Sequence, residues 1–118
     1  MMHGHFIVCG LGRIGFNVVR ELSATGHSFV AIEPSQAAID SYLLQDRRGD
    51  GRVLLADASD DDALLDAGLK NAAGVFAVTG DDSKNMLISL SAKQLNPDVR
   101  VVARAHDVRN VEKCRRAG

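Results

Sequence analysis

The sequence is poor in aromatic residues, and it has no long hydrophobic run. Among its 118 residues there is no tryptophan, and aromatic residues make up only 4%. The core must therefore be built from valine, isoleucine, leucine and alanine. A membrane-spanning helix needs ~20 consecutive apolar residues. Because no run approaches that length, we expect no direct membrane insertion by this segment.

Cysteine is also scarce. Cys9 and Cys114 are the two cysteines, and they lie far apart in the sequence. This spacing forms neither a disulfide framework nor a zinc-ligand pattern, so we expect no metal site and a reducing compartment. No signal peptide is visible. The expected location is therefore the cytoplasm.

An excess of charge of one sign is missing as well. The 14 basic residues nearly balance the 15 acidic ones, which leaves a net charge of −1. Binding to nucleic acid or to an anionic membrane favours a strongly basic surface. We therefore expect no nucleic-acid partner. The hydrophobic fraction of 46% is ordinary for a soluble protein, and the length suits one domain over residues 1–118.

What the sequence does contain is a regular alternation of short apolar runs and longer amphipathic ones. Strands are expected over 5–9, 28–33, 52–56, 74–79 and 99–103. Helices are expected over 13–24, after a cap at Ser35, after a cap at Ser59, over 82–95, and from Asp107 to Arg116. The apolar residues of the second helix include Leu43 and Leu44, and those of the fourth include Leu87 and Leu90.

This repeated strand–helix order predicts an α/β fold. Strands that alternate with helices form a mostly parallel sheet with helices on both faces, and the crossovers are right-handed. We expect a Rossmann-like, doubly wound sheet of five strands in the order 3-2-1-4-5, with all strands buried and continuously apolar. In such a sheet a ligand binds at the carboxyl ends of the strands, where strands 1 and 4 diverge. We call this edge the crevice.

A glycine-rich motif, Gly10-Leu11-Gly12-Arg13-Ile14-Gly15, directly follows the first expected strand and opens the first expected helix. Gly10 permits the tight turn, Gly12 lets the backbone approach a pyrophosphate, and Gly15 lets the helix pack closely on the strand. The helix start then offers free N–H groups to phosphates. Arg13 is expected to reach over the same phosphates.

An acidic residue, Glu33, ends the second expected strand. At this position a carboxylate accepts hydrogen bonds from ribose hydroxyls and repels a 2′-phosphate. Glu33 therefore favours NAD(H) over its phosphorylated form. It does not separate NAD(H) from ATP, ADP or AMP, which carry the same ribose diol.

Other polar residues follow the later strands. Asp57, Thr79 and Arg104 come after the third, fourth and fifth strands and are candidates for ligand contact, although turn and capping roles also explain such residues. His106 is a lone histidine without a nucleophile pattern around it. Because no catalytic arrangement is recognisable, the chain is not expected to be an enzyme.

Together these stretches resemble the N-terminal lobe of the RCK domain, the regulator of potassium conductance, also called the KTN or TrkA-N domain. The resemblance rests on the glycine motif with its strand, then Ala31-Ile32-Glu33, Asp57-Ala58-Ser59, Leu65-Asp66-Ala67-Gly68-Leu69, Val75-Phe76-Ala77-Val78-Thr79 with Asp82 and Asn85, Val101-Val102-Ala103-Arg104-Ala105, and Arg115-Arg116-Ala117-Gly118.

The resemblance implies a cytosolic nucleotide sensor that belongs to a larger channel or transport regulator. Such domains form homo-oligomers, as dimers or rings of dimers, and act on a potassium channel or transporter pore. By the match, Gly10, Gly12, Arg13 and Gly15 would hold phosphates and Glu33 the ribose. Asp57 and Ala58 would border the adenine.

Two alternatives remain at this point. The chain could be a fragment of an NAD-dependent oxidoreductase that lacks its catalytic domain, which predicts hydride exchange with a substrate. It could also be an oligomerisation module with a vestigial site, which predicts no nucleotide binding. The sensor predicts binding without turnover.

Overall fold

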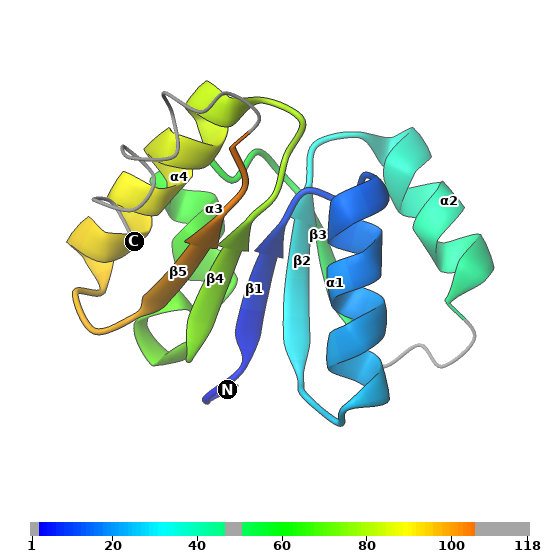
Figure 1. The fold of residues 1–118 in the computed structure, drawn as a ribbon, viewed down its shortest axis with the longest axis horizontal. Helices are drawn as coiled ribbons and strands as arrows, with labels where there is room; N and C mark the ends of the chain where they lie inside the picture. Colours follow the sequence, from blue (N-terminus) through cyan, green and yellow to red (C-terminus); the bar gives the residue numbers. More distant parts are fainter. Residues whose placement is uncertain (1–2, 47–50, 106–118) are drawn as a thin grey trace.

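The fold is a five-stranded parallel sheet between two layers of helices (Figure 1). A computed structural model describes residues 3–46 and 51–105. The strand order is β3-β2-β1-β4-β5, as the sequence predicts. The strands are β1 (Phe6–Cys9), β2 (Phe29–Glu33), β3 (Arg52–Leu55), β4 (Gly74–Ala77) and β5 (Arg100–Ala103). Each is one or two residues shorter than expected.

The central strand β1 sets the core. It pairs in parallel with β2 on one side, Phe6 opposite Phe29, and with β4 on the other, Phe6 opposite Gly74. Ile7, Val8 and Cys9 are fully buried because helices cover both faces of this strand. Burial raises the pKa of the Cys9 thiol to about 12, so this cysteine is an unreactive core residue.

The expectation that all five strands are buried is wrong for the two edge strands. In β3, Leu55 has 58% of its surface exposed, and in β5, Val102 has 56% exposed. An edge strand has a neighbour on one side only, so helices seated over the centre of the sheet leave part of it open. The predicted strand order already placed both strands at the edges of the sheet, but their apolar sequences do not show that the helices leave Leu55 and Val102 exposed.

Two helices cover one face of the sheet. Helix α1 (Arg13–Ala24) spans the predicted residues, and α2 (Gln36–Gln45) begins after its predicted cap, since the Ser35 hydroxyl oxygen accepts the N–H of Ala38. Gly26, with φ +77°, ends the first helical segment in the left-handed conformation that glycine favours. These helices pack on a core cluster that contains Val8, Val19, Leu22, Phe29, Ile39 and Tyr42.

The other face is covered by α3 (Asp61–Asp66) and α4 (Asp82–Leu95), with a short 3₁₀ helix η1 (Leu69–Asn71) between α3 and β4. Their core cluster contains Ile7, Ile32, Leu64, Leu69, Val75, Ile88 and Ala92. Adjacent residues of β1 thus point into opposite layers, Val8 toward α1 and Ile7 toward α4, as the period of two in a strand requires.

The inward faces of two helices differ from the apolar residues that the sequence singles out. In α2, Tyr42 is buried while Leu43 and Leu44 are 55% and 86% exposed. In α4 the buried residues are Asn85, Ile88, Ser89 and Ala92, and Leu87 and Leu90 face outward. Which side of a helix meets the sheet is set by packing, and both helices carry apolar residues on two sides.

The cap of α3 also differs from the expectation. Asp60 is the N-cap, because its side chain accepts the N–H of Asp62, and Ser59 instead donates its N–H and its hydroxyl to Asp57. The helix ends at Asp66 rather than continuing to Leu69. Gly68 breaks it there with φ +82°.

Some expectations fall outside the described residues. They concern His106, the last helix from Asp107 to Arg116, and Cys114. Within residues 3–46 and 51–105, no helix is long and apolar enough to cross a membrane.

Candidate nucleotide site

The glycine turn joins β1 to α1 at the carboxyl edge of the sheet, and two of its glycines are required by the fold itself. Gly10 has φ +104°, and a Cβ there would lie 3.0 Å from Cα of Thr79. A Cβ at Gly15 would overlap the carbonyl oxygen of Gly10. The chain can therefore turn this tightly, and α1 can approach this closely, only with glycine at both positions.

Gly12 is different. It is exposed, and a Cβ there would meet no protein atom within 4 Å. Its backbone is extended, with φ −75° and ψ −160°, a conformation open to any residue. The packing of the chain therefore gives no reason for glycine at this position, whereas close approach of a ligand does.

Helix α1 is also capped differently from the other α-helices. The side chains of Ser35, Asp60 and Asp81 each accept a backbone N–H at the start of α2, α3 and α4. The N-cap of α1 is Gly12, which has no side chain, and the first turn holds no acidic residue. The N–H groups of this turn have no acceptor within the helix, and the helix dipole adds partial positive charge.

Glu33 lies beside the glycine turn and is almost fully buried, with 8% of its surface exposed. Its Oε1 accepts the backbone N–H of Leu11 at 2.8 Å, and its Oε2 accepts that of Ser35 at 2.8 Å. The carboxylate thus joins the end of β2 to the turn and to the start of α2. Each carboxylate oxygen keeps a second lone pair that can accept from a sugar hydroxyl.

The hydrogen bond from Leu11 to Glu33 leaves fewer backbone N–H groups of the glycine turn that could bind a phosphate. The N–H of Leu11 is used by Glu33, and that of Gly10 is donated to the carbonyl oxygen of Ile32 at 2.9 Å. The amides at the start of α1, from Gly12 to Gly15, are those that the helix leaves without an intrahelical acceptor, because its first internal bond is the one from Phe16 to Gly12. The side chains of Leu11 and Ile14 pack in the core cluster of the α1 layer.

Asp57 follows β3, next to Glu33 in the sheet, since the N–H of Ala56 is donated to the carbonyl oxygen of Glu33. The pKa of Asp57 lies below its usual 3.8, chiefly because its carboxylate accepts the backbone N–H and then the hydroxyl of Ser59. An ion pair with Lys84 at 3.1 Å adds to this effect.

Lys84 and Ala58 are neighbours of Asp57 in the fold and in the sequence, respectively. Lys84, in the first turn of α4, is a neighbour of Asp57 that sequence reasoning missed, because nothing local links residues so far apart in the chain. Ala58 is buried in the core cluster of the α4 layer, so its side chain is not exposed to a ligand.

Thr79 and Arg104 follow β4 and β5, and a buried asparagine holds both. Asn85 Oδ1 accepts the N–H of Thr79 at 2.8 Å and its hydroxyl at 2.7 Å. Asn85 Nδ2 donates to the carbonyl oxygens of Thr79 and Arg104, each at 3.1 Å. The sequence shows Asn85 as one polar residue after β4 but does not indicate this role.

Two arginines, Arg13 and Arg104, follow strands at this edge of the sheet in the part of the chain that the structure describes. Arg13 is exposed at the first position of α1, and Arg104 is half-buried just after β5. Neither guanidinium has an ion pair among residues 3–46 and 51–105. In the same residues, no group of three or more His, Cys, Asp or Glu side chains is placed to hold a metal ion. The arrangement suits an anionic ligand rather than a cation.

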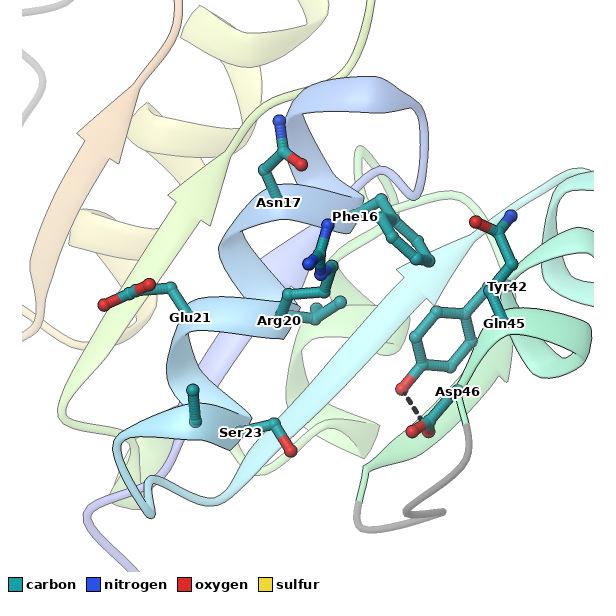
Figure 2. Close-up of a pocket in the computed structure, with 10 residues that line it drawn as sticks. Phe16, Asn17, Arg20, Glu21, Ser23, Tyr42, Gln45 and Asp46 are labelled. Carbon is teal, nitrogen blue, oxygen red and sulfur yellow. Dashed lines mark hydrogen bonds between the residues drawn. The ribbon is translucent and has the colours of Figure 1, made fainter.

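A separate groove of about 690 Å³ lies between α1 and α2, away from the crevice (Figure 2). Phe16 and Tyr42 meet edge to face there, with ring centroids 6.0 Å apart, and the Tyr42 hydroxyl donates to Asp46 at 2.8 Å. Arg20 lies over the Phe16 ring. The groove shares no residue with the glycine turn or with Glu33, so its size does not bear on the nucleotide site.

Comparison with known proteins identifies the family. The family model described as the TrkA-N domain matches residues 6–118. The chain belongs to the TrkA-N family. This match agrees with the resemblance drawn from the sequence. The parallel sheet in the order 3-2-1-4-5 is also consistent with a solved TrkA-N domain whose fold is similar.

Relatives of this TrkA-N domain include potassium channel proteins. The chain is 32% identical over 117 residues to potassium channel protein 1 of Methanocaldococcus jannaschii, a match that covers 99% of this chain and 34% of the channel. Of three curated relatives, the chain spans 18%, 34% and 44% of the full length.

Solved structures of similar fold include a TrkA-N domain. The TrkA-N domain of the inner membrane protein ybaL from Escherichia coli superposes with a TM-score of 0.87 at 26% identity, covering 99% of this chain and 84% of that one. The Shewanella denitrificans Kef C-terminal domain in its AMP-bound form has a TM-score of 0.80 at 30% identity, covering 98% of this chain and 66% of that one.

Proposed function

We propose that this TrkA-N domain is a cytosolic nucleotide-sensing regulatory domain that controls a potassium channel or transporter. The observation that carries the proposal is the uncapped start of α1 with the Glu33 carboxylate beside it. A helix start without a capping side chain suits a phosphate, and the neighbouring carboxylate suits a ribose. The AMP-bound Kef domain and the potassium channel relative support this assignment.

The expected ligand is NAD(H) or an adenine nucleotide such as ATP, ADP or AMP. In the proposed complex the turn from Gly10 to Gly15 holds the phosphates, with Arg13 above them. Glu33 accepts from the ribose hydroxyls, and Asp57 and Ala58 border the adenine. Thr79 and Arg104 lie on the other side of the crevice, toward β4 and β5.

The proposed regulation is a shift between assembled states. The domain is expected to form homo-oligomers, as dimers or rings of dimers, on the cytosolic side of the membrane beside a pore subunit or pore domain. Bound nucleotide can shift the assembly only by as much as its affinity differs between the two states. The proposal therefore requires binding that changes the assembly, and it requires no chemical turnover.

Isothermal titration calorimetry with NAD⁺, NADH, ATP, ADP and AMP tests the proposal. We expect saturable binding of at least one of them, with no reaction of the nucleotide and with a change in oligomeric state by light scattering. Hydride exchange with a substrate would favour the oxidoreductase fragment instead. No binding at millimolar nucleotide would contradict the proposal and leave a vestigial site.

A further inference from the structure

The buried amide of Asn85 has its hydrogen-bonding capacity filled at the crevice. A side-chain amide has two N–H donors and two oxygen lone pairs. In Asn85 the oxygen accepts twice from Thr79, and the nitrogen donates to the carbonyl oxygens of Thr79 and Arg104. The side chain is fully buried on the inward face of α4, where the neighbouring buried positions are Ile88 and Ser89.

These contacts bring together two strand ends that are separate in the sequence. Thr79 follows β4 and packs against the glycine turn, since a Cβ at Gly10 would lie 3.0 Å from Cα of Thr79. Arg104 follows β5, and its own N–H is donated to Ala77 in β4 at 2.9 Å. Any shift of the Asn85 amide would therefore move Thr79 against the turn and displace the backbone of Arg104.

The contacts also limit what Thr79 can do directly. Its hydroxyl has two acceptors, Asn85 Oδ1 at 2.7 Å and the carbonyl oxygen of Asp81 at 3.2 Å, and its oxygen accepts the N–H of Asp81 at 3.2 Å. This hydroxyl is thus part of the support of the crevice.

We propose that Asn85 is a positioning residue of the nucleotide site: its amide holds Thr79 against the glycine turn and Arg104 at the crevice edge, and it does not touch the ligand itself. The inference rests on the proposed function. It adds that one side chain of α4, Asn85, holds the segments after β4 and β5 in place at the crevice.

Asn85→Asp tests the proposal at constant volume. The change replaces the N–H donor with an oxygen that faces two carbonyl oxygens, which disfavours the observed arrangement. We expect the Kd for AMP or NAD⁺, measured by calorimetry on the 118-residue chain, to rise by about tenfold or more. A folded Asn85→Asp chain with the wild-type Kd would overturn the proposal.

Asn96 offers a matched control on the same helix. It follows the last residue of α4, at the other end of the helix, and its Nδ2 donates to the carbonyl oxygen of Leu69 at 2.8 Å. Asn96→Asp should lower thermal stability while it leaves the Kd within about twofold. An equal rise of the Kd in both variants would show a general effect of destabilisation and would overturn the positioning role.

A double-mutant cycle with Arg104→Ala separates positioning from a purely structural role. Because Asn85 holds both Thr79 and Arg104, the affinity loss caused by Asn85→Asp should be smaller in the Arg104→Ala chain than in the wild-type chain, where the route through Arg104 is intact. Fully additive losses, or a wild-type Kd in Arg104→Ala alone, would contradict the route through Arg104.

Thr79→Val provides a second variant should Asn85→Asp not fold. It removes the hydroxyl donated to Asn85 and keeps the branched shape, and we expect it to raise the Kd, whereas an unchanged Kd would overturn the proposal. A wild-type chain that binds neither AMP nor NAD⁺ would remove the proposed function itself. Wild-type binding together with unaffected variants would remove only the role of Asn85.

Discussion

At the scale of single residues, Glu33 has a structural role beside the role proposed for it. Its position at the end of β2 predicts a contact with a ribose. In the structure its two oxygens accept the N–H groups of Leu11 and Ser35, so the carboxylate supports the glycine turn. The sequence could not predict this support, because the choice of backbone partners depends on the approach of three segments.

We predict that Glu33→Gln weakens both binding and folding. The amide replaces one acceptor with a donor that faces a backbone N–H, so unfolding should become easier by about 1–3 kcal/mol. The affinity for AMP should fall as well. Urea unfolding and calorimetry measure the two effects. Glu21→Gln, an exposed change on α1, is the control and should alter neither; wild-type affinity in Glu33→Gln would remove Glu33 from the site.

Asp57 leads to a prediction on pH. Its pKa is lowered in the folded chain, mainly by Ser59. A lowered pKa stabilises the fold at pH values above the unfolded pKa, and this contribution is lost as the pH falls through the folded value. In Asp57→Asn, the unfolding free energy should therefore decline less steeply below about pH 4. Urea denaturation at several pH values measures the slope, and an unchanged slope would contradict the assignment.

At the scale of elements, the sequence predicted the helix boundaries that depend on a few neighbouring residues. The extent of α1, the cap at Ser35 and the stop at Gly26 were predictable because each depends on a few neighbouring residues. The burial of Tyr42 in place of Leu43 and Leu44 was not, because it depends on how α2 is rotated on the sheet. The exposure of Leu55 and Val102 was also missed, because it depends on where the helices lie over the edge strands.

The glycine turn allows a contrast between two alanine variants. Gly15→Ala should destabilise the fold by about 2 kcal/mol or more, because the new Cβ would overlap the Gly10 carbonyl oxygen. Gly12→Ala should cost less, about 1 kcal/mol at most, because its Cβ meets no protein atom and only the preference of the N-cap for glycine is lost. Thermal unfolding compares them, and equal losses in both would contradict the packing described for the turn.

A third change at the turn should move stability and binding in opposite directions. Gly12→Asp places a carboxylate at the N-cap of α1, which should stabilise the helix by about 1 kcal/mol. The same carboxylate would occupy the position proposed for phosphate and repel it, so AMP affinity should fall well below that of Gly12→Ala. Retained affinity in a stabilised Gly12→Asp chain would place the phosphate elsewhere.

At the scale of the whole molecule, the sequence predicted the sheet order and the edge at which the candidate residues meet. The candidate residues share one edge because all strands run parallel, and the right-handed crossovers limit the strand orders that are possible. The Lys84–Asp57 ion pair and the Asn85 network were not predicted, because each joins residues from different elements. These contacts join α4 to the segments that directly follow β3, β4 and β5 at the crevice.

A titration of the ¹⁵N-labelled chain with AMP, followed by the amide NMR signals, tests most directly whether a phosphate binds at the start of α1. We predict saturable shifts at Gly12, Arg13 and Ile14, with smaller changes along the groove between α1 and α2. Gly12→Asp should suppress these shifts. Saturable shifts confined to the groove, or no shifts at millimolar AMP, would contradict a phosphate site at the start of α1.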